Sequence, residues 1–152
     1  MKFSTRTLYG LKAILVLAGR YGEGSMSVSQ IAKKEGISVA YLEQILNALK
    51  KKGLVKSVRG PQGGYVLAQK PSEITLEHLF YSMESKAFAG KDGKSTLLPE
   101  MDEVAVGNAL FWQKFGTSLQ NGLSKTSLKD LVDEARHIKK AKLKLPATLF
   151  HI

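Results

Sequence analysis

The sequence predicts a mainly helical α+β fold, in which a winged helix-turn-helix domain is followed by a long dimerisation helix. Three observations indicate this fold class. Two helical patterns are separated only by residues 36–38, a glycine-rich turn lies between two short apolar runs within 54–68, and a further helical pattern covers 104–123. This order predicts a winged domain at 1–84, a loop at 85–103, and a dimerisation helix with a C-terminal extension at 104–152.

Serine caps and apolar spacing define the three helices of the first domain. Apolar residues recur every three or four positions from 4 to 20, which predicts a first helix with one apolar face. Ser27 and Gln30 have the spacing of a capping box, so a short second helix should begin there and stop at Gly36. Ser38 can cap a third helix, whose inner face would contain Leu42, Ile45, Leu46 and Leu49.

The third helix is followed by a hairpin. Residues 59–64, with the sequence RGPQGG, favour neither a helix nor a core, so they most simply form the turn between strands at 54–58 and 65–68. The glycines at 60, 63 and 64 would allow positive φ angles and a close approach of the backbone to phosphates. The result is a wing whose tip carries the cation of Arg59.

The second half of the chain predicts three further helices. Thr75 caps one that ends near Glu84, and Ser127 caps another over 128–137. Between them, one side of the helix at 104–123 carries Ala105, Trp112, Phe115, Leu119 and Leu123. This side would either fold back on the core or pair with its copy across a homodimer two-fold axis, and we favour the homodimer. The final LPATLFHI segment would be a tail or a strand added to a partner's edge.

Positive charge is concentrated in the first half of the chain. The 152 residues contain 23 Lys and Arg against 13 Asp and Glu, a net charge of +10. Residues 1–70 hold 12 basic and 3 acidic residues, net +9, which leaves 11 and 10, net +1, for residues 71–152. Such a basic domain suggests a polyanionic partner, nucleic acid or an anionic membrane surface, and the alternative is a basic surface kept for solubility.

Composition disfavours several classes of site. The chain has no cysteine, which excludes disulfides, thiolate nucleophiles and cysteine-ligated metal centres. His78, His137 and His151 stand far apart, and no nucleophile–base set is visible, so we expect neither an enzyme nor a resident cofactor or metal. No apolar run approaches the roughly 18 residues of a membrane span and no signal-peptide pattern is present, so we expect a cytoplasmic protein that does not enter a membrane.

Residues 2–84 resemble the Rrf-type (IscR/NsrR/CymR) family of bacterial winged-helix transcription regulators. The matching segments are MKFSTRTLYGLKAILVLA, SVSQIAKKEGIS, YLEQILNALKKKGLVKSVRGPQGGYVLA and EITLEHLF, and a weaker match continues through Trp112 and TSLKDLV. The resemblance implies a homodimer that binds an imperfect palindrome in double-stranded DNA, with the long helix at the dimer interface. We therefore expect a sequence-specific transcription regulator, and specifically a repressor.

The resemblance also implies which residues contact DNA. The matching positions are Ser38, Tyr41, Glu43 and Gln44, followed in the wing by Arg59, Gly60 and Gly64. Glu43 can accept from a cytosine amino group, Gln44 can pair with an adenine edge or a phosphate, and Arg59 suits a narrow minor groove. Tyr41 can donate to a phosphate or contact a thymine methyl group. Two alternatives are that Tyr41 only covers the helix surface and that Glu43 only balances nearby lysines.

Two further sets complete the expected DNA-binding surface. Ala40 lies within the same turn, at a position where many relatives carry a polar residue. Phosphate contacts would come from lysines of the basic half, namely Lys33, Lys34, Lys50, Lys51, Lys52 and Lys56.

The chain departs from the family at the iron–sulfur cluster. Many members hold a two-iron two-sulfur cluster through three cysteines and one further ligand, and the approximate ligand spacings are occupied here by Lys94, Glu100, Val106 and Ala109. The chain therefore resembles the cluster-free branch, whose members respond to a metabolic enzyme partner or a small molecule. We expect such an effector to act through residues 85–103 and the long helix.

The alternative function is that of a winged-helix protein-interaction module, which would bind a partner enzyme or complex instead of an operator. In that case the hairpin would be a surface turn with an ordinary solvated arginine. The wing arginine and the polar start of the third helix favour DNA binding.

Overall fold

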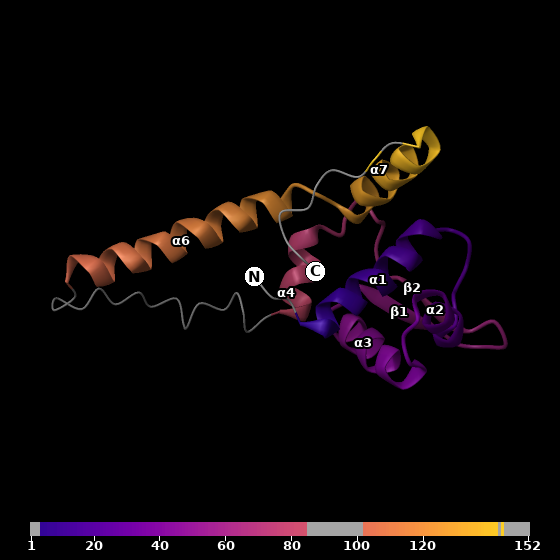
Figure 1. Ribbon diagram of the computed structural model, residues 1–152. Coiled ribbons are helices and arrows are strands. Elements are labelled where there is room, and N and C mark those ends of the chain that lie inside the picture. Colours follow the sequence, from indigo (N-terminus) through magenta and orange to yellow (C-terminus); the bar gives the residue numbers. More distant parts are fainter. Residues whose placement is uncertain (1–3, 85–101, 143, 145–152) are drawn as a thin grey trace.

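The computed structural model describes residues 4–84, 102–142 and 144. The helices and strands are α1 (Thr5–Gly19), α2 (Val28–Glu35), α3 (Val39–Lys51), β1 (Val55–Val58), β2 (Gly64–Leu67), α4 (Leu76–Met83), α6 (Glu103–Ser124) and α7 (Leu128–Ala141). This order confirms the expected mainly helical fold with a hairpin wing (Figure 1). Residues 85–101 and the LPATLFHI segment, for which we predicted a loop and a tail or strand, lie outside the described residues.

The core forms where α1, α2 and α3 meet the hairpin. Its largest fully buried side chains are aliphatic and come from all parts of the body: Ile14, Ile31, Leu42, Ile45, Leu46, Leu49, Val55, Ile74, Leu79 and Leu128. Burial of one such side chain contributes roughly 1.5–3 kcal/mol relative to leaving it exposed. Packing of the inner face of α3 therefore fixes the direction of its outer face.

The helices begin at the predicted caps. Ser27 Oγ accepts from the Gln30 backbone N at 3.2 Å and Gln30 Oε1 accepts from the Ser27 backbone N at 2.9 Å, so the capping box is complete. Gly36 ends α2 with a φ of +66°, in the left-handed region that suits glycine. Ser38 then caps α3, and the turn between the two helices is as short as predicted.

The wing is a two-stranded antiparallel sheet with an additional bridge. Val55 lies opposite Leu67, and Val58 lies opposite Gly64. Met26 forms a bridge to Tyr65 through two backbone hydrogen bonds of 3.1 and 2.9 Å. The hairpin is therefore attached to the segment between α1 and α2, and its strands match the predicted runs to within one residue at each end.

The two C-terminal helices contact the body differently. In Figure 1, α6 extends away from the body, and none of its residues is buried. The fold-back alternative therefore does not describe Trp112 and Phe115, which are exposed, whereas Leu119 and Leu123 near the C-terminal end of α6 lie against α4. No helix within the described ranges is both long and apolar enough to cross a bilayer.

Helix α7 returns to the winged domain. Thr75 and Ser127 form a backbone bridge, Leu128 is fully buried, and Arg136 Nη2 donates to the Gly19 carbonyl at 2.8 Å. The helix continues to Ala141 instead of ending near 137. Lys139 and Lys140 lie in its last turn, where cations are stabilised by the negative end of the helix dipole.

Candidate nucleic-acid interface

Helix α3 presents a solvent-exposed face opposite the core. Its inner side chains are buried, whereas Ser38, Ala40, Glu43 and Gln44 are exposed. These four residues lie in the first half of the helix, the half that enters a major groove in helix-turn-helix proteins. The structure thus brings the predicted recognition residues together on one face.

The first turn of α3 also carries an apolar side chain that sequence reasoning missed. Val39 is 43% exposed, although its spacing of three from Leu42 assigns it to the buried face. It escapes burial because it lies in the first helical turn, beyond the edge of the core. Its position between Ser38 and Ala40, which are both predicted to contact DNA, could have indicated that Val39 is exposed.

Tyr41 has a packing role that does not depend on DNA. It is half-buried, and its ring meets that of Tyr9 edge to face, with the centroids 5.9 Å apart. The ring therefore helps to hold α3 on α1. Glu43 takes part in none of the ion pairs among the described residues. These ion pairs therefore do not support the alternative that Glu43 only balances the charge of nearby lysines.

The wing tip is held by backbone contacts that expose Arg59. The Gly63 backbone N donates to the Gly60 carbonyl at 2.8 Å, and Ser25 Oγ donates to the Gln62 carbonyl at 2.5 Å. Arg59 is exposed and belongs to none of the ion pairs of the described segments. Its guanidinium is therefore available to an external anion.

The wing glycines serve two different purposes. Of the three glycines that allow positive φ angles, Gly60 uses this freedom, with a φ of +121°, whereas Gly63 and Gly64 do not have positive φ. A Cβ at Gly64 would lie 2.2 Å from the Met26 carbonyl oxygen, because the bridge to Tyr65 brings the two backbones together. The close approach at Gly64 is therefore to the chain's own backbone.

The six lysines predicted to contact phosphates are all exposed. They lie on α2, at the end of α3 and on β1: Lys33, Lys34, Lys50, Lys51, Lys52 and Lys56. None of them pairs with a carboxylate in the part of the chain that is described, and Lys50 Nζ donates to Ser57 Oγ at 2.8 Å. Because neighbouring side chains alternate along a strand, Lys56 points to the opposite face from Ser57, toward a hollow beside α1.

The four residues predicted for dimerisation fall into two groups on α6. Trp112 and Phe115 are 60% and 41% exposed, and their rings form an aromatic cluster with Phe111. Leu119 and Leu123 are half-buried in a small hollow beside α4. Of these two groups, the aromatic one is exposed and the leucines are partly covered by α4.

The residues present do not fit an iron–sulfur cluster. Val106 and Ala109, at two of the approximate ligand spacings, lie on α6 and have no donor atom in their side chains, while 94 and 100 are outside the described residues. The chain contains no cysteine thiolate to replace them. Within the described ranges, no group of three histidine or acidic side chains is placed to hold a metal ion.

A family profile described as "Rrf2: Iron-dependent Transcriptional regulator" matches residues 3–134. The HTH-type transcriptional regulator CymR of Bacillus subtilis is 34% identical over 131 residues, which cover 86% of this chain and 89% of that protein. Protein rrf2 of Nitratidesulfovibrio vulgaris is 32% identical over 136 residues, with 89% of each chain covered.

Solved structures show the same similarity. The structure of CymR from B. subtilis, described as its global cysteine regulator, has a TM-score of 0.71 at 33% identity and covers 88% of this chain and 98% of its own. The structure of T. potens IscR has a TM-score of 0.74 at 34% identity, with 96% and 94% covered. The similarity thus extends from the winged domain through the long helix.

Proposed function

Because the chain belongs to the Rrf2 family of transcriptional regulators, we propose that it binds an imperfect palindrome in double-stranded DNA as a homodimer and represses transcription. It is a winged helix-turn-helix regulator and not an enzyme. Its site of action is the cytoplasm, where bacterial DNA lies.

The observation that supports this proposal is that the fold exposes both the start of α3 and the tip of the wing and holds each of them in place. The core fixes the start of α3 with its exposed Ser38, Glu43 and Gln44, and Met26 fixes the wing that carries Arg59. In a winged helix the first element enters the major groove and the wing tip reaches the backbone or the adjacent minor groove. Glu43 and Gln44 then read bases, while Arg59 and the lysines contact the sugar–phosphate surface.

We assign the three proposed roles to successive segments of the chain. Residues 1–84 bind DNA, residues 85–103 receive the signal, and residues 104–152 dimerise and extend the C-terminus. Leu128 of α7 is buried in the core of the winged domain, and α7 directly follows α6 in the chain. A displacement of α6 would therefore be transmitted through α7 to the winged domain. An effector or partner enzyme needs a coupling of roughly 1–3 kcal/mol to act as a useful switch.

Fluorescence anisotropy with labelled operator DNA at increasing salt tests the proposal. We expect affinity to fall steeply as salt rises, because several lysines and Arg59 displace counterions from the phosphates. Arg59→Ala should weaken binding by about tenfold or more, and Glu43→Ala should broaden the bound sequences. Lys125→Ala, which removes an equal charge beyond the end of α6, is the matched control and should bind normally. Salt-insensitive binding would instead favour the protein-interaction module.

A further inference from the structure

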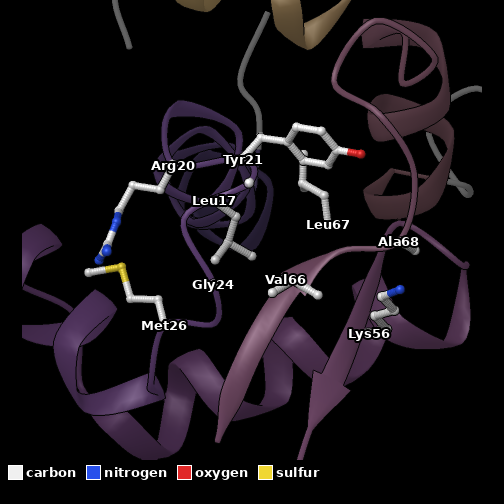
Figure 2. A pocket seen from close by; sticks show the side chains of 10 residues that line it. Leu17, Arg20, Tyr21, Gly24, Met26, Lys56, Val66, Leu67 and Ala68 are labelled. Carbon is white, nitrogen blue, oxygen red and sulfur yellow. The ribbon is translucent and has the colours of Figure 1, made fainter. Parts of the chain in front are cut away.

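A pocket of about 360 Å³ lies between the C-terminal end of α1 and the wing (Figure 2). Its apolar lining includes Leu17, Met26 and Val66, and two cationic side chains, Arg20 and Lys56, complete it. We refer to it as the α1–wing pocket. Its volume lies in the range of small-molecule sites, which combine an apolar lining with a few polar groups.

The charge of the pocket suits an anion. Of the residues that line it, two are basic and none is acidic. Arg20 Nε donates to Glu23 Oε2 at 3.0 Å, which leaves the two Nη groups of the guanidinium for a ligand. Lys56 forms no ion pair with any described carboxylate. In Figure 2 the two cationic groups stand on opposite sides of Leu17 and Val66.

The pocket touches the parts that hold the wing in place. Lys56 and Val66 are cross-strand partners in the stem of the hairpin. Gly22 and Gly24, on the other side, belong to the segment whose Ser25 donates to Gln62 at the wing tip. A ligand that fills the pocket therefore contacts both the stem and the segment to which the tip is bonded.

We propose that the α1–wing pocket binds a small organic carboxylate with an apolar body, and that its occupation shifts the wing and changes affinity for DNA. The apolar body lies on Leu17 and Val66, and the carboxylate is paired by Arg20. The effect on DNA rests on the function proposed above, whereas the binding itself does not.

Binding is tested on the full-length protein without DNA. Benzoate is titrated into ¹⁵N-labelled protein while backbone amide shifts are followed, and benzamide serves as the neutral probe of similar shape. We expect saturable benzoate shifts at Leu17, Met26 and Val66, with about tenfold weaker binding of benzamide. Arg20→Gln should weaken benzoate binding by about tenfold, while the control Lys12→Gln, an exposed lysine elsewhere on α1, should not.

Coupling is tested by measuring operator affinity with and without saturating benzoate. We expect a several-fold change in wild type and none in Arg20→Gln. The site is overturned if benzoate shifts no pocket amide, or shifts them equally in Arg20→Gln. The link to the wing is overturned if benzoate binds but DNA affinity stays constant. Loss of specific DNA binding in the absence of benzoate would instead overturn the proposed function and leave the site standing.

Discussion

Val39 is a large apolar side chain of α3 that is 43% exposed, and it lies beside the proposed contacts Ser38 and Ala40. Apolar side chains in the major groove contact the 5-methyl group of thymine. In the proposed complex, Val39 would add an apolar contact to a thymine methyl group beside the polar contacts of Glu43 and Gln44.

Replacement of thymine by uracil in the bound operator tests this role, because it removes only the methyl group. We expect wild-type affinity to fall about fourfold at one position, since burial of one methyl is worth about 0.8 kcal/mol. Val39→Ser should bind both operators equally when measured by anisotropy. Val58→Ser, which alters an exposed valine of the wing, is the control and should keep the preference for thymine. An equal preference in wild type would contradict the role of Val39.

Gly64 gives a prediction for stability. Gly64→Ala should lower the free energy of unfolding by about 1–3 kcal/mol, because the new Cβ would overlap the Met26 carbonyl. Gly19→Ala is the matched control, since a Cβ at that position meets no atom within 4 Å and the free energy should not fall. Urea denaturation measures both. A Gly64→Ala variant as stable as wild type would mean that the bridge between Met26 and Tyr65 is not as close as described.

At the scale of elements, Glu84 fastens α4 to the start of α1. Its Oε1 accepts from the Ser4 backbone N at 3.0 Å, from Ser4 Oγ at 2.6 Å and from Thr7 Oγ1 at 2.5 Å. The hydroxyls of Ser4 and Thr7 stabilise the carboxylate and hold the pKa of Glu84 below its ordinary value.

The pH dependence of this contact has a definite sign. Because the pKa is lower in the folded state, the stabilisation is present above the pKa of the unfolded chain and is lost as pH falls through the folded value. Glu84→Gln should therefore lower Tm by a few degrees at pH 7, and the difference should shrink below about pH 4. Thermal unfolding at several pH values measures this. A difference in Tm between wild type and Glu84→Gln that grows toward low pH would contradict this role of Glu84. Glu134→Gln, on the exposed side of α7, is the control and should leave Tm unchanged.

Elements were predictable where their signals are local. Ser27, Ser38, Thr75 and Ser127 each cap the helix assigned to them, because a cap depends on residues only three positions away. The burial of Leu128 in the winged domain was not predictable, because it depends on the distant bridge between Ser127 and Thr75.

The candidate site shows the same limit. The exposure of Glu43, Gln44 and Arg59 follows from helix spacing and the hairpin turn, and the sequence places them correctly on the surface. The crowding of Gly64 by Met26 arises from contact between distant segments, which spacing along the chain does not contain. The α1–wing pocket was missed for the same reason, since Arg20 and Lys56 come together only in the fold.

At the scale of the whole molecule, α6 is the helix whose large apolar side chains are left exposed. Its exposed large apolar side chains are Val104, Leu110, Phe111, Trp112 and Phe115. The rings of Phe111, Trp112 and Phe115 contact one another, and an exposed apolar cluster of this kind usually marks an interaction site. A two-fold pairing of α6 with its copy would cover this surface and place two winged domains on one palindrome.

Double substitution of Trp112 and Phe115 by alanine tests the dimer. We expect wild type to sediment as a dimer at micromolar concentration and the double variant to shift toward monomer, with a large loss of operator affinity because the half-sites are then bound separately. Lys114→Ala, between the two aromatic residues, should remain dimeric. A monomeric wild type would contradict the assignment of α6.

The most direct test of DNA recognition is the recovery of random genomic fragments by the purified protein at about 0.15 M salt, beside Arg59→Ala and Glu43→Ala. Sequencing of the recovered fragments should reveal one shared imperfect palindrome for wild type. Arg59→Ala should recover the same motif in much lower yield, and Glu43→Ala should recover a broader one. Uniform recovery of all fragments, unchanged by either substitution, would contradict sequence-specific recognition by α3 and the wing.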